Sequence, residues 1–344
     1  MMGDLIVQKY GGTSVGDLEC IRNVAQRVAR TRDSGKNVLV VVSAMAGETD
    51  KLFEMANALC ANPDRREIDL LLSSGERISA ALLSIALQSL GCPAVALTGR
   101  QMGLLTDNSH TRARIIQIDA ERVKKLLKEN HVVVCAGFQG INELGDVTTL
   151  GRGGSDTSAV ALAVALQSEI CEIYTDVRGV FTADPKMAPN ARKLHLVSFD
   201  EMLEMASLGA RVLQLRCVEY AKKFNMPILV RSTFDGADEG TLICEERPEM
   251  EQPVVSGVMV DKDQSKITLL GVPDQPGIAA RIFEALAEKA ISVDVIIQNV
   301  SAAGHTDISF TLPTTNLNEA MPVMRQAAKE IQAQDVTADS EIAK

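Results

Sequence analysis

The sequence predicts an α/β protein in which a layered sheet carries helices on both faces, followed by a smaller α+β domain. Short runs rich in β-branched residues alternate with stretches of helical periodicity over about the first 230 residues. A polar segment with two prolines then interrupts this alternation, and a shorter series of strands and helices follows it. A chain of 344 residues is long enough for two domains that each bury a core.

The first domain, residues 1–245, is predicted mainly from its apolar strands. These are expected at residues 5–10, 38–43, 94–98, 132–136, 170–174 and 228–230. Helices fill the intervals, including one over residues 21–28 and one that Ser198 and Glu201 open as a capping box. Ligands of such sheets bind beyond the carboxyl ends of the strands. The side chains expected to emerge there are Lys9, Ser43, Phe138 and Thr175.

The second domain, residues 256–344, follows a predicted linker at residues 246–255. Its expected order is strand, helix, strand, strand, helix, at residues 266–272, 278–289, 293–300, 306–312 and 317–332. The turn at residues 273–277 contains two prolines and a glycine, which ends the first strand before the helix begins.

Composition narrows the classes of partner. A net charge of −10 without a run of Lys and Arg argues against nucleic acid or an anionic membrane as the main partner. The longest apolar run, residues 159–166, is far too short to span a bilayer, so we expect a cytoplasmic protein. Seven widely spaced cysteines fit reduced core residues, and four scattered histidines show no metal-ligand spacing. No protein-bound metal site is predicted.

Two glycine loops predict an anion site. Gly151, Arg152, Gly153, Gly154, Ser155 and Asp156 lead into an apolar helix, and strand 5–10 delivers Lys9 to a turn containing Gly11 and Gly12. Arg152 can bind a carboxylate or phosphate, while Asp156 either caps the helix or acts on the substrate. An ordinary turn with an ordinary N-cap remains the alternative for the second loop. Neither loop fits the P-loop or dinucleotide fingerprints, because their glycine spacing is absent.

Four motifs resemble those of the aspartate kinases, in the order of that family. They are the segments at residues 9–14 (Lys-Tyr-Gly-Gly-Thr-Ser), 43–45 (Ser-Ala-Met), 74–77 (Ser-Gly-Glu-Arg) and 151–156 (Gly-Arg-Gly-Gly-Ser-Asp). The similarity continues through residues 174–185, and the second domain resembles an ACT regulatory domain. The resemblance therefore implies an amino-acid-kinase-like catalytic domain that phosphorylates the side chain of L-aspartate with ATP, giving 4-phospho-L-aspartate for lysine, threonine and methionine synthesis.

The resemblance also implies site residues. Lys9 and Asp156 would be catalytic, Lys9 on the transferring phosphoryl group and Asp156 positioning it. ATP, with Mg²⁺ arriving on the nucleotide, would meet Lys9, Tyr10, Gly11, Gly12, Ser14, Thr175, Asp176, Phe181, Asp184, Lys186 and Arg211. Many relatives have Tyr, Arg and Lys where this chain has Phe181, Lys186 and Arg211, so nucleotide affinity is expected to differ.

The substrate residues implied are Ser43, Ala44, Thr49, Glu76, Phe138, Arg152, Gly153 and Ser155. Arg152 would clamp the carboxylate and Glu76 would receive the ammonium group. Without the surrounding motif, Glu76 and Arg77 would be interpreted as a pair on a helix surface. Two other functions compete with this one: a kinase for glutamate or acetylglutamate, and an inactive amino-acid sensor.

Regulatory residues implied by the ACT resemblance are Asp274, Gly277, Ile278, Asp294, Gln298 and Asn299, with lysine and threonine as effectors. The same residues also suit a turn and a strand end, so the alternative stays open. Related chains carry two ACT units that pair, whereas a second unit is missing before Lys344, by natural or artificial truncation. Pairing implies a homo-oligomer or a complex with a second ACT-bearing subunit.

Overall fold

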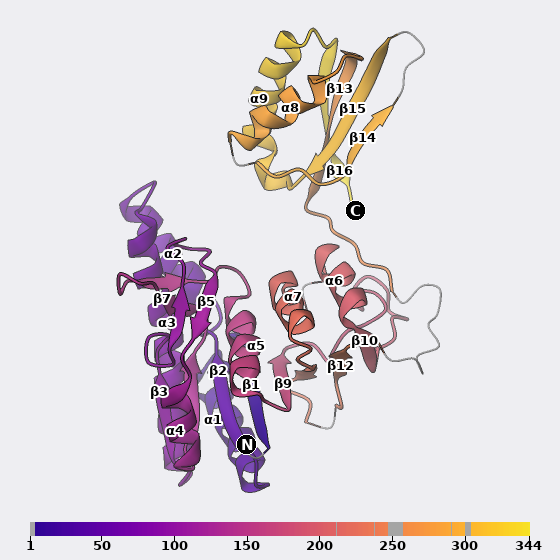
Figure 1. Cartoon of the computed structure of the whole chain (residues 1–344). Helices are drawn as coiled ribbons and strands as arrows, with labels where there is room; N and C mark the ends of the chain where they lie inside the picture. The colour runs from indigo at the N-terminus through magenta and orange to yellow at the C-terminus, as the bar shows by residue number, and fades with distance from the viewer. Residues whose placement is uncertain (1–3, 211, 237, 247–256, 290, 300–303) are drawn as a thin grey trace. The chain divides into compact units, whose positions relative to one another are not determined.

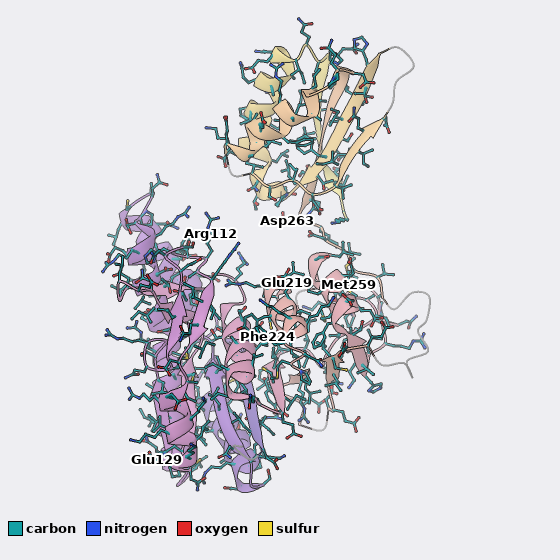
Figure 2. The ribbon with its side chains drawn as sticks, in the orientation of Figure 1. Arg112, Glu129, Glu219, Phe224, Met259 and Asp263 are labelled. Carbon is teal, nitrogen blue, oxygen red and sulfur yellow. The ribbon has the colours of Figure 1, made fainter. Side chains whose placement is uncertain are left out.

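The chain folds into two compact units, residues 1–259 and 260–344, shown in Figure 1. This computed structural model describes residues 4–210, 212–236, 238–246, 257–289, 291–299 and 304–344. Arg211 and nearly all of the linker expected at 246–255 lie outside these residues. The second unit begins slightly later than the expected residue 256, because Val258 and Met259 belong to the first unit. The Val258 amide donates to the Thr182 carbonyl, and Met259, labelled in Figure 2, packs on the core of the first unit.

The first unit is built on an eight-stranded sheet in the order β10-β12-β11-β9-β1-β2-β6-β3. Its neighbouring strands are parallel except for β12, which runs antiparallel to β11. The bounds are β1 (Leu5–Tyr10), β2 (Asn37–Val42), β3 (Ala94–Leu97), β6 (Val132–Ala136), β9 (Ile170–Thr175), β10 (Leu196–Ser198), β11 (Ile228–Ser232) and β12 (Thr241–Cys244). All six strands expected from the sequence are present.

A second sheet of four short strands was not predicted from the sequence. It has the order β5-β4-β7-β8, and its strands are β4 (Leu104–Thr106), β5 (Ile115–Ile118), β7 (Gln139–Ile141) and β8 (Val147–Thr149). Strands of three or four residues are too short to display a period-2 pattern. This sheet matters because β8 ends directly before the loop at residues 150–153.

Helices cover both faces of the large sheet, as expected. On one face, α1 (Leu18–Asp33) and α3 (Arg65–Ser89) form one apolar core, to which β2 contributes Val38, Val40 and Val42. The other face carries α4 (Glu121–Lys128), α5 (Gly154–Leu166), α6 (Phe199–Ser207) and α7 (Leu215–Lys223). α2 (Glu48–Leu59) contacts α3 and buries none of its own residues, and η1 (Thr13–Val15) is a 3₁₀ turn after β1.

α3 is the one described helix with the length and composition of a membrane span. Half of that stretch is buried inside the unit, and the buried residues include the carboxylates of Asp69 and Glu76. Carboxylates facing a protein core mark this as a core helix of the α/β layer.

The second unit is a four-stranded antiparallel sheet with two helices packed on it. Its strands are β13 (Gln264–Pro273), β14 (Ile296–Asn299), β15 (His305–Leu312) and β16 (Asp335–Ile342), in the order β14-β15-β13-β16, and its helices are α8 (Ile278–Ala287) and α9 (Leu317–Glu330), with a 3₁₀ turn η2 (Thr314–Asn316). The expected order omitted β16, and this omission was wrong. Most of the side chains of β16 are exposed and polar, so its sequence carries no apolar alternation.

Candidate functional site

The motif residues converge because five parallel strands end at one edge of the large sheet. Tyr10 at the end of β1 is in register with Val42 on β2 and with Tyr174 on β9. Val42 is in register with Ala136, the last residue of β6, and Thr175 with Ser232, the last residue of β11. The loops that follow these strands therefore lie side by side, which is the usual location of a ligand site in a parallel sheet.

A buried ion pair joins the two glycine loops. The Nζ atom of Lys9, on β1, lies 2.6 Å from Oδ1 of Asp156, on α5, and both side chains are only about a tenth exposed. The Lys9 amine also lies beside Gly11, where a Cβ would approach Nζ to 3.5 Å. One nearly buried ammonium group is thus held at the sheet edge, next to a glycine loop.

The first glycine loop is held in place by its backbone. The Gly11 amide donates to the Tyr174 carbonyl, and the Ala46 amide donates to the Gly12 carbonyl. A Cβ on Gly12 would lie 2.9 Å from the Ala44 carbonyl oxygen, so only glycine allows this approach of two loops. The ring of Tyr10 is fully buried, so a ligand would reach this residue only through its backbone.

Glu76 is a buried carboxylate with one free oxygen. Its Oε1 accepts a hydrogen bond of 3.1 Å from the Ala44 amide, and its buried Oε2 has no partner in the described structure. Burial raises the pKa of Glu76 to about 7, although the Ala44 hydrogen bond acts in the opposite direction. Arg77 instead donates to Ser73 and Gln139, so the surface pair with Glu76 considered above is not formed.

The second glycine loop opens α5 without a side-chain cap. Gly153 is the N-cap residue in a left-handed conformation (φ 66°), so neither Ser155 nor Asp156 is the N-cap considered above. Asp156 turns to Lys9 instead. Arg152 is exposed and has no ion-pair partner among the described residues. Ser155 and Phe138 lie beside this loop, because Cβ atoms on Gly137 and Gly154 would come within 3.0 Å of them.

Two of the residues expected at the nucleotide, Thr175 and Asp176, lie at the carboxyl end of β9. Thr175 donates to the exposed carboxylate of Asp176, and the Thr233 amide donates to the Thr175 carbonyl. Ser14 joins this group, since its hydroxyl lies 2.6 Å from that of Thr233.

Phe181, Asp184 and Lys186 follow at the far end of this connection. The Lys186 amide donates to Asp184, which forms a local turn, and Phe181 bridges to Lys193. The described structure gives no hydrogen bond or ion pair that joins Phe181, Asp184, Lys186 or Thr49 to Lys9 or Asp156.

Among the residues that hold the site, Arg27, Thr233 and Asp69 were missed from the sequence, whereas Tyr10 was expected at the nucleotide. Tyr10 stacks on Tyr174 with ring centroids 4.8 Å apart, and the Arg27 guanidinium lies over Tyr174 and donates to the Thr233 carbonyl. Asp69 on α3 is fully buried and accepts four hydrogen bonds. An acidic residue seven positions before Glu76, on the same apolar helix face, was the signal that could have identified Asp69.

The second unit contains a cavity of about 320 Å³ at the start of α8. Asp274, Gly277, Ile278 and Gln298 are among its lining residues, and Gly277 is the left-handed N-cap of α8 (φ 87°). The cavity lining does not include the other two residues expected there. Asp294 forms an ion pair with Lys344, and the Asn299 carbonyl accepts a hydrogen bond from Thr306.

Two family models match separate parts of the chain. Residues 4–232 match the amino acid kinase family, and residues 267–327 match an ACT domain. The chain is 48% identical over 340 residues to the aspartate kinase of Pseudomonas putida, which covers 99% of this chain and 83% of the relative. It is also 48% identical over 345 residues to the aspartokinase of Corynebacterium glutamicum, covering 99% of this chain and 82% of the relative.

Solved aspartokinase structures are also similar to this chain. Aspartokinase III of E. coli in complex with aspartate and ADP superposes with a TM-score of 0.79 at 27% identity, covering 99% of this chain and 86% of that one. The same enzyme in complex with lysine and aspartate gives a TM-score of 0.77 at 27% identity, covering 97% of this chain and 85% of that one.

Proposed function

Because the chain belongs to the amino acid kinase family and is an aspartate kinase, an ATP-dependent enzyme of amino-acid biosynthesis, we propose that its active site is the sheet edge around Lys9. The observation that carries this proposal is the buried Lys9–Asp156 ion pair between two glycine loops. Transfer of a phosphoryl group needs neutralised charge and alignment more than covalent help. The fixed ammonium group of Lys9 neutralises phosphate charge, and the neighbouring loop amides align the phosphoryl group.

Lys9 contacts the transferring phosphoryl group, assisted by the amides of Gly11 and Gly12. Asp156 is a positioning residue, because its carboxylate holds the Lys9 amine at the loop. The acceptor carboxylate of aspartate is ionised at neutral pH and needs no strong base. The product is 4-phospho-L-aspartate.

Glu76 and Arg152 recognise the amino-acid head of L-aspartate. The free Oε2 of Glu76 accepts a hydrogen bond from the substrate ammonium group, which satisfies an otherwise unpaired buried oxygen. Arg152 is exposed and free to form two parallel hydrogen bonds with the α-carboxylate. The remaining lining of this pocket consists of Ser43, Ala44, Thr49, Phe138, Gly153 and Ser155.

ATP binds beside β9, with Mg²⁺ carried on its phosphates. Thr175 and Asp176 meet the adenine and ribose, and Tyr10 and Ser14 belong to the loop under the phosphates. Phe181, Asp184 and Lys186 follow along the nucleotide edge. Arg211, whose structure is not described, completes the proposed set.

Residues 256–344 regulate the catalytic residues 1–245 through the linker at 246–255. The cavity at α8 offers an amino acid two complementary charges: the Asp274 carboxylate for its ammonium group and the helix N-terminus for its carboxylate. Lysine or threonine is the proposed effector there, with Asp294 and Asn299 joining when ACT units pair in an oligomer. The proposed pathway leads to lysine, threonine and methionine in the cytoplasm.

The test is release of ADP from MgATP with L-aspartate, L-glutamate or no acceptor, with hydroxylamine added to trap an acyl phosphate. We expect release and hydroxamate formation that depend on L-aspartate. Preference for L-glutamate, or release that no acceptor stimulates, would contradict the proposed reaction.

A further inference from the structure

A buried carboxylate outside the proposed active site ties two of its parts together. Asp69 lies on α3 with no exposed surface, and none of its hydrogen-bond partners is a Lys or Arg. Burying a carboxylate is costly unless hydrogen bonds compensate for the lost water. The position of those hydrogen bonds therefore indicates what the residue does.

The first partner is the connection between β4 and β5, residues 107–114. The Thr111 amide donates to both carboxylate oxygens of Asp69 at 3.0 Å, and Nδ1 of His110 lies 2.7 Å from Oδ2. A carboxylate only accepts, so the His110 tautomer with hydrogen on Nδ1 fits this contact. Arg112, labelled in Figure 2, belongs to the same connection.

The second partner is Thr149, the last residue of β8, whose hydroxyl donates to Oδ1 of Asp69. Leu150, Gly151 and Arg152 follow immediately. The side chain of Asp69 thus fixes the strand end from which the Arg152 loop departs.

The two partners also hold each other. The Ala113 amide donates to the Thr149 carbonyl, and a Cβ on Gly151 would lie 3.1 Å from the Thr111 carbonyl oxygen. From the other side, the guanidinium of Arg216 donates to the carbonyls of Leu150 and Ala113. The loop carrying Arg152 therefore rests on residues 107–114, which Asp69 anchors.

Asp69 and Glu76 are seven residues apart on α3, which places them on the same face of one helix. We propose that Asp69 is a positioning residue that fixes the Arg152 loop relative to Glu76, so that one helix sets the distance between the groups that bind the carboxylate and the ammonium of the substrate. This inference rests on the function proposed above. His110 and Thr149 act through the same carboxylate.

The test compares Asp69→Asn with wild type, with Ser84→Ala on the same helix as control. Asparagine keeps the size of the side chain but replaces one acceptor oxygen by a donor. We expect the KM for L-aspartate to rise about tenfold or more, the loss typical of a buried hydrogen bond to a charged group, with the KM for ATP within about twofold. Ser84 is buried without a hydrogen-bond partner in the described structure, so its variant should match wild type.

Amide hydrogen exchange supplies a readout that does not depend on catalysis. Asp69→Asn should speed exchange at residues 107–114 and 149–154 while leaving residues 9–16 unchanged. If wild type does not phosphorylate aspartate, the proposed function fails, and exchange alone then decides whether Asp69 fixes these segments.

Two results would overturn the positioning role: an unchanged aspartate KM in a folded variant, or equal rises in the KM values for aspartate and ATP. If Asp69→Asn does not fold, Thr149→Val decides by the same criteria. It removes one hydroxyl from a buried site and leaves the carboxylate its other three hydrogen bonds.

Discussion

Replacing Glu76 by glutamine gives a pH-dependent change in stability that the structure allows us to calculate. Glu76 is 3% exposed, and burial raises its pKa from 4.5 to about 7. Glutamine has nearly the same shape and keeps the oxygen that accepts from Ala44. It cannot ionise, so it does not pay for burying a charge.

The sign follows from proton binding in the two states. Below pH 4.5, Glu76 is protonated in both the folded and the unfolded chain. Between pH 4.5 and about 7 the unfolded chain releases the proton and the folded chain keeps it, so wild-type stability falls as pH rises through this window. Above about pH 7 the cost is constant, at about 3 kcal/mol.

Relative to wild type, Glu76→Gln should therefore gain about 2.5 kcal/mol between pH 5 and pH 8.5. The new buried N–H groups cost about 1–3 kcal/mol, but equally at both pH values. Urea unfolding of wild type and variant gives the difference in their free energies of unfolding at pH 5 and at pH 8.5. The change in that difference between the two pH values is the double difference that tests the prediction. Glu129→Gln, at an exposed residue labelled in Figure 2, is the control and should give a value near zero.

A double difference near zero for Glu76→Gln as well would refute the raised pKa.

The same pKa predicts that binding of L-aspartate depends on pH, because only ionised Glu76 attracts the ammonium group of the substrate. About a tenth of the free enzyme is ionised at pH 6, so the KM for L-aspartate should be about tenfold higher there than at pH 8. A KM that does not vary over this range would contradict the assigned role.

Three further predictions concern other parts of the chain. Lys9→Ala should lower turnover at least about a hundredfold, because it removes the charge beside the transferring phosphoryl group. It should also lower the free energy of unfolding in urea by about 3 kcal/mol, because Asp156 is left buried without a counter-charge. The double variant Lys9→Ala/Asp156→Ala should regain stability but not activity. Gly153→Ala should impair both aspartate binding and stability, because the new Cβ would lie 1.8 Å from a side-chain carbon of Gln214. Gly145→Ala is the control, since Gly145 also has a positive φ but no atom within 4 Å of the new Cβ. This control should lower the free energy of unfolding by about 1 kcal/mol and leave the KM for L-aspartate unchanged. Asp274→Ala should abolish inhibition by lysine or threonine in the ADP assay without changing the uninhibited rate; inhibition that persists would exclude the cavity at α8 as the effector site.

The large sheet was predictable because its strands are nearly continuous apolar runs. Residues 38–42, for example, are buried on both faces, and no polar alternation confuses the pattern. The strands that were not predicted lack such apolar runs. The polar edge strand β16 and the short strands β4, β5, β7 and β8 are held by pairing partners, and a partner distant in sequence leaves no local signal.

Local motifs in the sequence predicted which residues form the proposed site, but they did not predict how those residues are arranged in space. Glycines at 11, 12, 151 and 153 indicate loops where backbone amides approach a ligand, and this needs only the sequence. Asp156 had two open interpretations, as cap or as site residue. Its contact with Lys9 spans 147 positions of sequence and exists only because β1 and α5 pack together.

The sequence by itself determined the six apolar strands of the large sheet, the two glycine loops and the family, because apolar periodicity and glycine placement are local properties of the chain. Only the tertiary structure decided that Glu76 is buried with a raised pKa, that Lys9 and Asp156 form an ion pair, and that Asp69 accepts hydrogen bonds from Thr111 and Thr149. Burial and partner choice depend on what other segments supply. The sequence alone therefore does not show whether an Asp or Glu side chain on a helix faces water, a substrate or a neighbouring loop.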